Sequence, residues 1–252
     1  MGGLTGADDG GRRGDYGDAD YARLCFQEAP QCSSTAVGQG KVRAAGGYQV
    51  KILHDDPRIE LIQGLVTPME CERLVALARR KGLHASTVDP RGEGRSGPTS
   101  LGYRSSQTAW LEASPEDGLD LLASIDARIR NATGYSLESA EDYQIATYKG
   151  AQGPGGAEYK PHVDFASKSG TERGGNRLAT VMIYLAAPDI GGFTVFTELN
   201  VSVAPEVGSA VVWRNLKGGR GGAGDYRTRH GACPVLRGEK WIANKWIHED
   251  GN

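Results

Sequence analysis

The fold is decided by the stretch Leu178-Ala-Thr-Val-Met-Ile-Tyr-Leu185 and by shorter runs of the same kind around it. The β-branched and aromatic residues of this stretch are typical of a strand. Further runs with this character occupy residues 143–148, 159–165, 193–196, 210–213 and 241–247. Glycine-rich loops separate several of these runs, which favours antiparallel sheets over a parallel array with crossover helices.

A helix with clear start and end signals is predicted before these strands. Thr67 can cap it, Pro68 suits its first turn, and Glu70 completes a capping box. Gly82 is expected to end it. Further upstream, residues 48–53 and 59–62 also have the character of strands.

A second helix is predicted between Ser114, as its cap, and Gly134, as its end, with Pro115 in the first turn. Two helices followed by many strands are typical of an α+β protein. We therefore expect a core of two β-sheets with the helices packed on one face.

The N-terminal part of the chain differs in composition from the rest. Residues 1–45 are rich in Gly, Asp and Arg and show little periodicity, so we expect them to be flexible or loosely ordered. Residues 46–252 are expected to form one folded domain. The net charge of -2 predicts no general affinity for nucleic acid or anionic membranes. No apolar run has the length of a membrane span or of a signal core, so we expect a cytoplasmic protein, or one of the endoplasmic reticulum lumen if a signal segment has been removed.

Four cysteines leave the redox state of the chain open. Cys25 and Cys32 lie close together in a polar region and either form a local disulfide or stay reduced. Cys71 falls in the first predicted helix and Cys233 beside a candidate metal ligand. Both are expected to be free thiols.

One short segment places an imidazole and a carboxylate two positions apart. His162 and Asp164 lie in Tyr159-Lys-Pro-His-Val-Asp-Phe165, and in a strand such positions point to the same face. A second histidine, His230, precedes another strand-like run. Two histidines and one carboxylate form the facial triad of non-haem Fe(II) oxygenases. Three protein ligands on one face leave the other positions of the ion open for a keto acid and dioxygen.

Taken alone, a His-x-Asp pattern is also expected by chance, and an ordinary surface pair is the simpler interpretation. Lys240 changes this balance. It follows His230 by ten residues, beyond a turn at Gly238 that would bring its ammonium back towards the same pocket. A buried lysine needs an anion, such as the distal carboxylate of 2-oxoglutarate; the alternative is a surface lysine. Candidates for the pocket wall share strand faces: Thr180, Met182 and Tyr184 on one strand, and Gln144, Ala146 and Tyr148 on another.

Several motifs, taken together, resemble the catalytic domain of prolyl 4-hydroxylases. They are Tyr103-Arg-Ser-Ser-Gln-Thr-Ala-Trp-Leu111, His162-Val-Asp164, Asn176-Arg-Leu-Ala-Thr-Val-Met-Ile-Tyr-Leu185, Gly191-Gly-Phe-Thr-Val-Phe196 and the run 224–249. The last run is similar to the end of the collagen prolyl 4-hydroxylase catalytic subunit. The resemblance covers about residues 52–249, and it is specific because the motifs follow one another at compatible spacing.

The resemblance implies a double-stranded β-helix, or jelly-roll, core and makes residues 46–252 a catalytic domain. It implies that the two histidines and Asp164 bind Fe(II), and that Lys240 pairs with the C5 carboxylate of 2-oxoglutarate. Two further residues match positions that help to hold this cosubstrate, namely Thr180 and Tyr148.

Other positions of the resemblance concern the peptide. Tyr159 and Trp246 match aromatic positions around it, although ordinary core packing explains them equally well. The loop 89–102 corresponds to one that closes over peptide in the family. Two residues depart from the family pattern: Phe193 replaces a small polar residue or glutamate, and Arg214 replaces an aromatic residue.

The implied reaction is hydroxylation of peptidyl proline to 4-hydroxyproline, with release of succinate and CO2. It would use Fe(II), 2-oxoglutarate and dioxygen, with ascorbate as a candidate reductant, on a proline-rich or collagen-like peptide. The chain lacks the separate N-terminal peptide-binding region of the animal collagen enzyme, so we expect no obligate disulfide-isomerase partner. Three alternatives stay open: the same type of dioxygenase acting on free proline or another side chain, an oxygen-sensing hydroxylase with one protein target, and a non-catalytic module that binds proline-rich peptides.

Overall fold

A computed structural model describes residues 17–26, 41–86, 103–150, 155–166 and 175–252. The predicted peptide-closing loop 89–102 and Cys32 lie outside these residues. The elements in chain order are α1 (Gly17–Phe26), β1 (Val42–Ala45), β2 (Tyr48–His54), β3 (Ile59–Ile62), α2 (Pro68–Lys81), β4 (His84–Ala85), β5 (Gln107–Leu111), α3 (Leu119–Thr133), β6 (Tyr143–Lys149), β7 (Tyr159–His162), β8 (Arg177–Ala186), β9 (Ile190–Gly191), β10 (Thr194–Phe196), the 3-10 helix η1 (Thr197–Leu199), β11 (Val201–Val203), β12 (Ala210–Arg214), the 3-10 helix η2 (Tyr226–Thr228), β13 (His230–Ala232), β14 (Val235–Arg237) and β15 (Glu239–His248).

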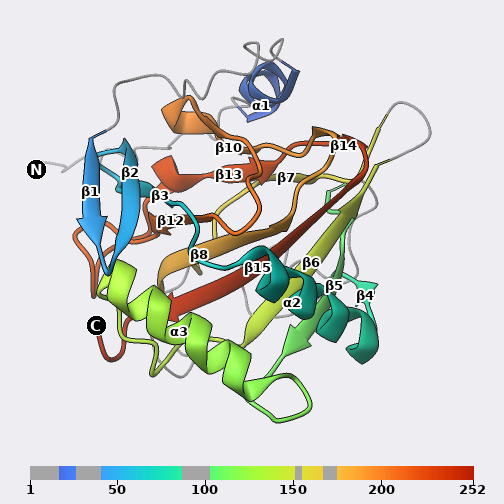
Figure 1. Cartoon of the computed structure of the whole chain (residues 1–252). Helices are drawn as coiled ribbons and strands as arrows, with labels where there is room; N and C mark the ends of the chain where they lie inside the picture. The colour runs from blue at the N-terminus through green and yellow to red at the C-terminus, as the bar shows by residue number, and fades with distance from the viewer. Residues whose placement is uncertain (1–16, 27–40, 87–102, 151–154, 167–174) are drawn as a thin grey trace, which may run out of the picture.

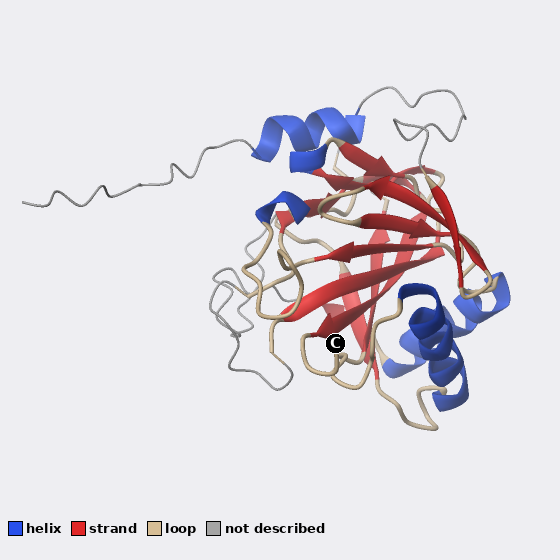
Figure 2. Cartoon of the chain, turned by 90° about the vertical axis from the view of Figure 1, so that its left-hand side faces the viewer, coloured by secondary structure: helices blue, strands red, loops and turns tan. Residues whose placement is uncertain are grey.

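Two antiparallel sheets face each other (Figure 2). The large sheet has the strand order β1-β2-β3-β12-β8-β15-β6-β5-β4, and the small sheet has the order β11-β10-β13-β7. A two-stranded ribbon, β14-β9, lies at one end. Helices α2 and α3 cover the outer face of the large sheet (Figure 1). The predicted jelly-roll core with helices on one face is confirmed.

The side chains of β8 point alternately into two separate apolar cores. Val181 and Ile183 belong to the core beneath α2 and α3. Met182 and Tyr184 belong to the core between the two sheets. Because successive side chains of a strand point to opposite faces, the same strand serves both cores, and its even-numbered residues face the interior of the jelly roll.

Helix α2 begins and ends as predicted. The Thr67 hydroxyl accepts a hydrogen bond from the Glu70 amide, and the Glu70 carboxylate accepts one from the Thr67 amide. Helix α3, in contrast, begins later than predicted. Ser114 caps only a preceding turn, in which its hydroxyl accepts from the Asp117 amide, and the helix starts after Gly118 in a left-handed conformation. The serine and proline signals of residues 114 and 115 therefore marked a turn rather than the helix itself.

The expected pattern of cysteines is wrong in two respects. Cys25 forms a disulfide with Cys233, with a Cα–Cα distance of 5.3 Å, so neither a Cys25–Cys32 bridge nor a free Cys233 is present. Cys71 is free and buried, as expected. The leader predicted to be loosely ordered up to residue 45 contains α1, which Cys25 ties to the small sheet, and it also contains β1. The disulfide therefore joins α1 to the residue after β13, and no local sequence signal predicts this pairing.

We expect reduction of this disulfide to destabilise the fold. The bridge closes 208 residues of chain, and loss of a native disulfide costs about 2–4 kcal/mol of unfolding free energy. Thermal unfolding with and without dithiothreitol should show a Tm that falls by several degrees on reduction. The Cys25→Ser variant should have the lower Tm under both conditions, and equal Tm values for reduced and oxidised wild type would contradict the prediction.

Candidate metal centre and lysine pocket

Three potential ligands meet between the two sheets. His162 ends β7 and His230 begins β13, and the two residues are paired across the small sheet. Asp164 follows two positions after His162. Its two oxygens lie 3.7 Å from His162 Nε2 and 3.8 Å from His230 Nε2. The ligand atoms all lie within 4.8 Å of one another, so the structure brings together the three residues that sequence spacing had suggested.

The backbone fixes the orientation of both imidazoles. His162 Nδ1 lies 2.9 Å from the Lys160 carbonyl, and His230 Nδ1 lies 3.0 Å from the Thr228 carbonyl. A carbonyl only accepts hydrogen bonds, so each Nδ1 carries the proton and each Nε2 lone pair is left for a ligand. Burial, with the nearby His230, lowers the pKa of His162 to about 3. The neutral form, which is the form that binds metals, therefore predominates.

Asp164 is held by a neighbouring strand. Burial alone would raise its pKa, but the adjacent histidines and the Thr180 hydroxyl outweigh burial and lower it. Thr180 Oγ1 donates a 2.8 Å hydrogen bond to Asp164 Oδ2 and accepts one of 2.9 Å from Asn215 Nδ2. Thr180 thus contacts a candidate metal ligand, and its role in holding the cosubstrate stays a prediction.

Lys240 is fully buried and forms no ion pair among the described residues. Its Nζ donates a 3.2 Å hydrogen bond to Thr194 Oγ1, which also accepts from the Tyr184 hydroxyl at 2.9 Å. Nζ lies 5.8 Å from the centre of the Tyr148 ring and 5.4 Å from that of Tyr184. Burial without a counter-ion lowers the pKa of Lys240 to about 7. An ammonium in such a place is suited to an anionic ligand that supplies the missing charge.

The ligand cluster and the lysine share one interior. Thr180, which binds Asp164, and Tyr184, which reaches Thr194 beside Lys240, lie on the same face of β8, with Met182 between them. On the facing sheet, Phe196 follows Thr194 at the same strand face, and its ring centre lies 5.7 Å from that of His230. A short dicarboxylate could therefore contact the ammonium at one end and the ligand cluster at the other.

Tyr159 and Trp246 lie beside the cluster. The Tyr159 ring stacks on the His162 ring, with 3.6 Å between the ring centres. The Arg104 guanidinium carbon lies 4.6 Å from the centre of the Tyr159 ring. The Trp246 Nε1 group is buried without a hydrogen-bond partner among the described residues. Its ring lies 6.0 Å from that of Trp110, which is 39% exposed. Tyr159 thus lies against a candidate ligand, Trp246 pairs with Thr180 across neighbouring strands, and Trp110 continues the aromatic surface towards solvent.

The residues that sequence reasoning missed are mostly polar partners of the predicted ones: Thr194, Asn215, Arg104 and Arg177. Thr194 could have been found, since it alternates with Phe196 on a predicted strand. The Arg177 guanidinium lies 4.0 Å from the centre of the Trp246 ring and binds Glu141. This contact lies between β8 and β15, and no local sequence pattern predicts that these two strands are neighbours.

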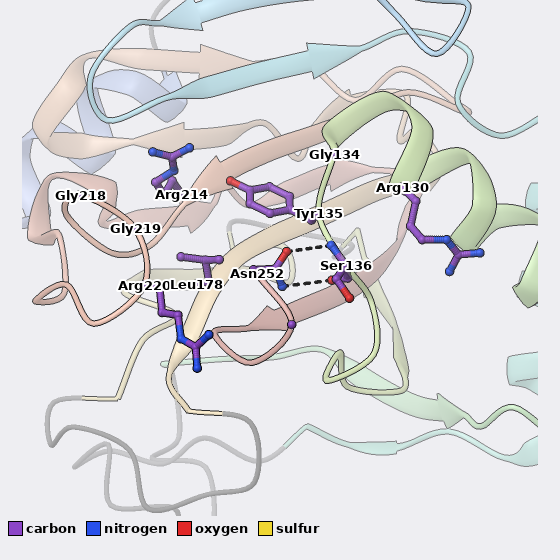
Figure 3. A pocket seen from close by; sticks show the side chains of 11 residues that line it. Arg130, Gly134, Tyr135, Ser136, Leu178, Arg214, Gly218, Gly219, Arg220 and Asn252 are labelled. Carbon is purple, nitrogen blue, oxygen red and sulfur yellow. Dashed lines mark hydrogen bonds between the residues drawn. The ribbon is translucent and has the colours of Figure 1, made fainter.

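A pocket of about 760 Å³ lies elsewhere, lined by residues such as Tyr135, Leu178 and Asn252 (Figure 3). None of the candidate metal ligands lines it. Its arginines, Arg130 and Arg214 among them, point in different directions rather than to one point (Figure 3). The arrangement of charges therefore favours the cluster between the sheets, not this pocket, as the functional site.

Comparison with known proteins agrees with this geometry. Residues 143–248, which carry the three ligands and Lys240, match the 2OG-Fe(II) oxygenase superfamily. In this segment the chain carries a 2OG-Fe(II) oxygenase domain. It is 40% identical over 201 residues to prolyl 4-hydroxylase subunit alpha-2 of Gallus gallus, covering 79% of this chain and 35% of that protein. It is also 40% identical over 202 residues to subunit alpha-1 of Rattus norvegicus, covering 78% and 35%.

The chain spans about a third of the length of these curated relatives. A solved structure of similar extent is that of a viral collagen prolyl hydroxylase from Paramecium Bursaria Chlorella virus-1 in its 2OG complex. It is 26% identical, with a TM-score of 0.56, over 75% of this chain and 94% of that one.

The residues present fit the group that the superfamily name implies. Two imidazoles and one carboxylate are a donor set suited to Fe(II), and their ligand atoms lie close enough together to share one ion. The buried Lys240 is a candidate partner for a carboxylate of 2-oxoglutarate.

Thr180 offers a test of how the ligand cluster would hold a metal ion. The Thr180→Val change keeps the shape of the side chain but removes the hydroxyl that contacts Asp164. Loss of a hydrogen bond to a metal ligand typically weakens metal binding about tenfold or more. We expect the Kd for Co(II) to rise by about this factor, with little change in the KM for 2-oxoglutarate. A raised KM with unchanged Co(II) affinity would instead favour the cosubstrate role that the family resemblance implies.

Proposed function

We propose that this protein hydroxylates C4 of proline in a peptide, with Fe(II), 2-oxoglutarate and dioxygen, and releases succinate and CO2. The observation that carries the proposal is the shared interior of a two-histidine, one-carboxylate cluster and a buried lysine without a counter-ion. The similarity to prolyl 4-hydroxylase subunits supports proline as the substrate residue.

Each residue of the site has a task in this reaction. His162, Asp164 and His230 would hold Fe(II) from one side, and their backbone and Thr180 contacts keep the donor atoms in place. When bound, Fe(II) supplies the redox chemistry that couples decarboxylation of the keto acid to oxidation of a C–H bond. Lys240 would bind the distal carboxylate of 2-oxoglutarate and so orient its keto acid end towards the ion.

The apolar walls of the interior protect the reaction. Met182, Phe196 and Trp213 are buried in the apolar core between the two sheets, where the lysine and the ligands lie. Such a lining excludes water and strengthens the charge pairing of Lys240 with its ligand. Because oxidation occurs at the metal, no residue is required as a general acid or base.

The aromatic surface at the mouth of the site supports a peptide substrate. Tyr159, Trp246 and Trp110 lie along one side of it, and proline rings pack well on aromatic faces. Arg104 lies nearby, with one guanidinium nitrogen donating to Gln144. We propose Tyr159 and Trp246 as contacts of the peptide; Tyr148 completes the cosubstrate pocket beside Lys240.

The test is succinate formation in the presence of Fe(II) and 2-oxoglutarate. A proline-rich peptide should stimulate it strongly, and mass spectrometry should place one added oxygen on a proline ring at C4. Stimulation by free proline alone, or oxygen on another side chain, would contradict the proposal. Binding of the peptide with no succinate in any condition would identify a non-catalytic module.

The disulfide bears on where this reaction takes place. Disulfides persist mainly in oxidising compartments, and Cys25–Cys233 fastens an element next to the site. This supports the endoplasmic reticulum lumen over the cytoplasm.

Binding of 2-oxoglutarate should weaken as the pH rises. In the ligand-free protein the pKa of Lys240 is about 7, so below this pH the amine is charged and above it neutral. A dicarboxylate binds the charged form, and binding at higher pH must therefore take up a proton. The KM for 2-oxoglutarate should rise above about pH 7, approaching about tenfold per pH unit.

The control for this pH dependence is Lys240→Arg, because a guanidinium stays charged throughout the range. Its KM for 2-oxoglutarate, measured from about pH 6.5 to about pH 8.5, should be nearly flat whatever its absolute value. A wild-type KM that is flat over the same range would contradict the prediction.

A further inference from the structure

Helix α1 lies on the outer face of the small sheet, on the opposite side of the protein from α2 and α3 (Figures 1 and 2). Tyr21 and Leu24 are buried there against Val195 and Cys233, with Phe193 packed at the edge of the same cluster. Phe193 is one of the two departures from the family pattern. Its contact with α1 explains the departure, because a small polar residue would leave this apolar cluster open.

Tyr21 contacts both strands that carry the histidine ligands. Its hydroxyl oxygen lies 2.7 Å from the Ala232 carbonyl, on β13, and 2.9 Å from Glu158 Oε2, next to β7. Ala232 pairs with Tyr159 across these strands. The hydroxyl, which has one hydrogen to share between these two acceptors, therefore lies between β13 and the residue that precedes β7, within two residues of His230.

The Tyr21 ring reaches still closer to the ligands. A Cβ atom added to Gly231, the residue after His230, would lie 2.9 Å from Tyr21 Cε2. Lys160 Nζ lies 5.4 Å from the centre of the ring and pairs with Glu158 at 3.0 Å. Lys160 is also the residue whose carbonyl orients His162. The Tyr21 ring thus lies beside residues that are one position from His230 and two positions from His162.

We propose that α1 is a clamp on the metal site, with Tyr21 as its positioning residue and the Cys25–Cys233 disulfide as its fastening. The clamp holds β7 and β13 at the spacing in which both Nε2 atoms reach one ion. It touches neither metal nor substrate. This inference rests on the proposed function, since it assumes that His162 and His230 bind a metal.

The test is Co(II) affinity of the apo-protein, followed by visible absorption of the bound ion, in wild type and Tyr21→Phe. The phenylalanine keeps the ring packing and removes only the bridging hydroxyl. Changes that act through a partner of a metal ligand weaken binding about tenfold or more. Since Tyr21 acts one contact further away, we expect the Kd for Co(II) to rise by about threefold to tenfold.

Two matched controls separate positioning from general stability. Tyr143→Phe removes another buried hydroxyl, which donates to Asp126 at 2.6 Å beneath α3, far from the small sheet's outer face. Arg23→Ala changes an exposed residue of α1 itself, which contacts Asp20 and Asn200. Both should keep the wild-type Kd for Co(II). A Tyr21→Phe protein with wild-type Kd, or a Tyr143→Phe protein with an equal loss, would overturn the proposal.

The fastening is tested by repeating Tyr21→Phe in the Cys25→Ser background. Without the disulfide α1 is held less firmly, so the tyrosine hydroxyl should matter less and the second change should raise the Kd by less than it does in wild type. An equal rise in both backgrounds would overturn the role of the disulfide. Failure of wild type itself to bind Co(II) would count against the metal site, and is thereby distinguished from failure of the clamp.

Discussion

Replacing His230 with alanine is expected to lower the rate of succinate formation by about a thousandfold or more, which corresponds to about 4 kcal/mol of transition-state stabilisation. The change removes one of three ligands from the proposed ion, and the two that remain leave it open to solvent and weakly held. His230 is buried, and its ring centre lies 4.6 Å from that of Trp213, so no other described histidine is placed to substitute for it.

The measurement is succinate release under saturating Fe(II), 2-oxoglutarate and peptide. His54→Ala is the matched control, because His54 lies on β2 and contacts only the Pro57 carbonyl among the polar groups described. It should retain nearly full activity. If His230→Ala kept more than about a tenth of the wild-type rate, equivalent to a loss of only about 1.4 kcal/mol, the assignment of this histidine as a ligand would be wrong.

Replacing Lys240 with methionine should raise the KM for 2-oxoglutarate by about a hundredfold to a thousandfold. The variant fills the same space without charge, so a bound dicarboxylate would place one carboxylate in an apolar interior without a partner. Such a loss costs about 3–5 kcal/mol. Metal binding should persist, because no ligand of the cluster touches Lys240.

The control is Lys245→Met, which changes another buried lysine of the same strand. Lys245 faces the opposite side of β15, where Nζ lies 3.9 Å from Asp126 and 4.4 Å from the Tyr143 ring centre. The KM for 2-oxoglutarate should change little in this variant. An equal rise in KM for both variants, or none for Lys240→Met, would contradict the role of Lys240 as the carboxylate-binding residue.

The sequence predicted the centre of the site because strand geometry is local. His162 and Asp164 fall two positions apart, which in a strand would place them on one face. The strand is shorter than predicted, since β7 ends at His162 and Asp164 follows it in a bend. To predict that His230 pairs with His162, the order of the strands must also be known. The resemblance to a family implied that order, whereas the alternation of side chains along each strand does not reveal it. The burial of Lys240 followed from the turn at Gly238, which has a positive φ of 88°.

The parts that the sequence left unpredicted depend on contacts between distant segments. Cys25 and Cys233 meet only because α1 docks on the small sheet, and the compositional bias around α1 suggested disorder instead. The Thr180 hydroxyl shares a strand face with Tyr184, but which of the two contacts the ligand cluster is decided by the register of β8 against its neighbours. Ser114 and Pro115 gave a helix signal that a turn satisfies equally well.

The central claim is that one ion is held by His162, Asp164 and His230 next to a lysine that binds 2-oxoglutarate. An anaerobic titration of the apo-protein with Fe(II) and 2-oxoglutarate, followed through the visible metal-to-ligand charge-transfer band, tests it most directly. We predict a saturable band at one equivalent of each for wild type, and its loss in His162→Ala and His230→Ala. A band of unchanged intensity in either variant would contradict the account.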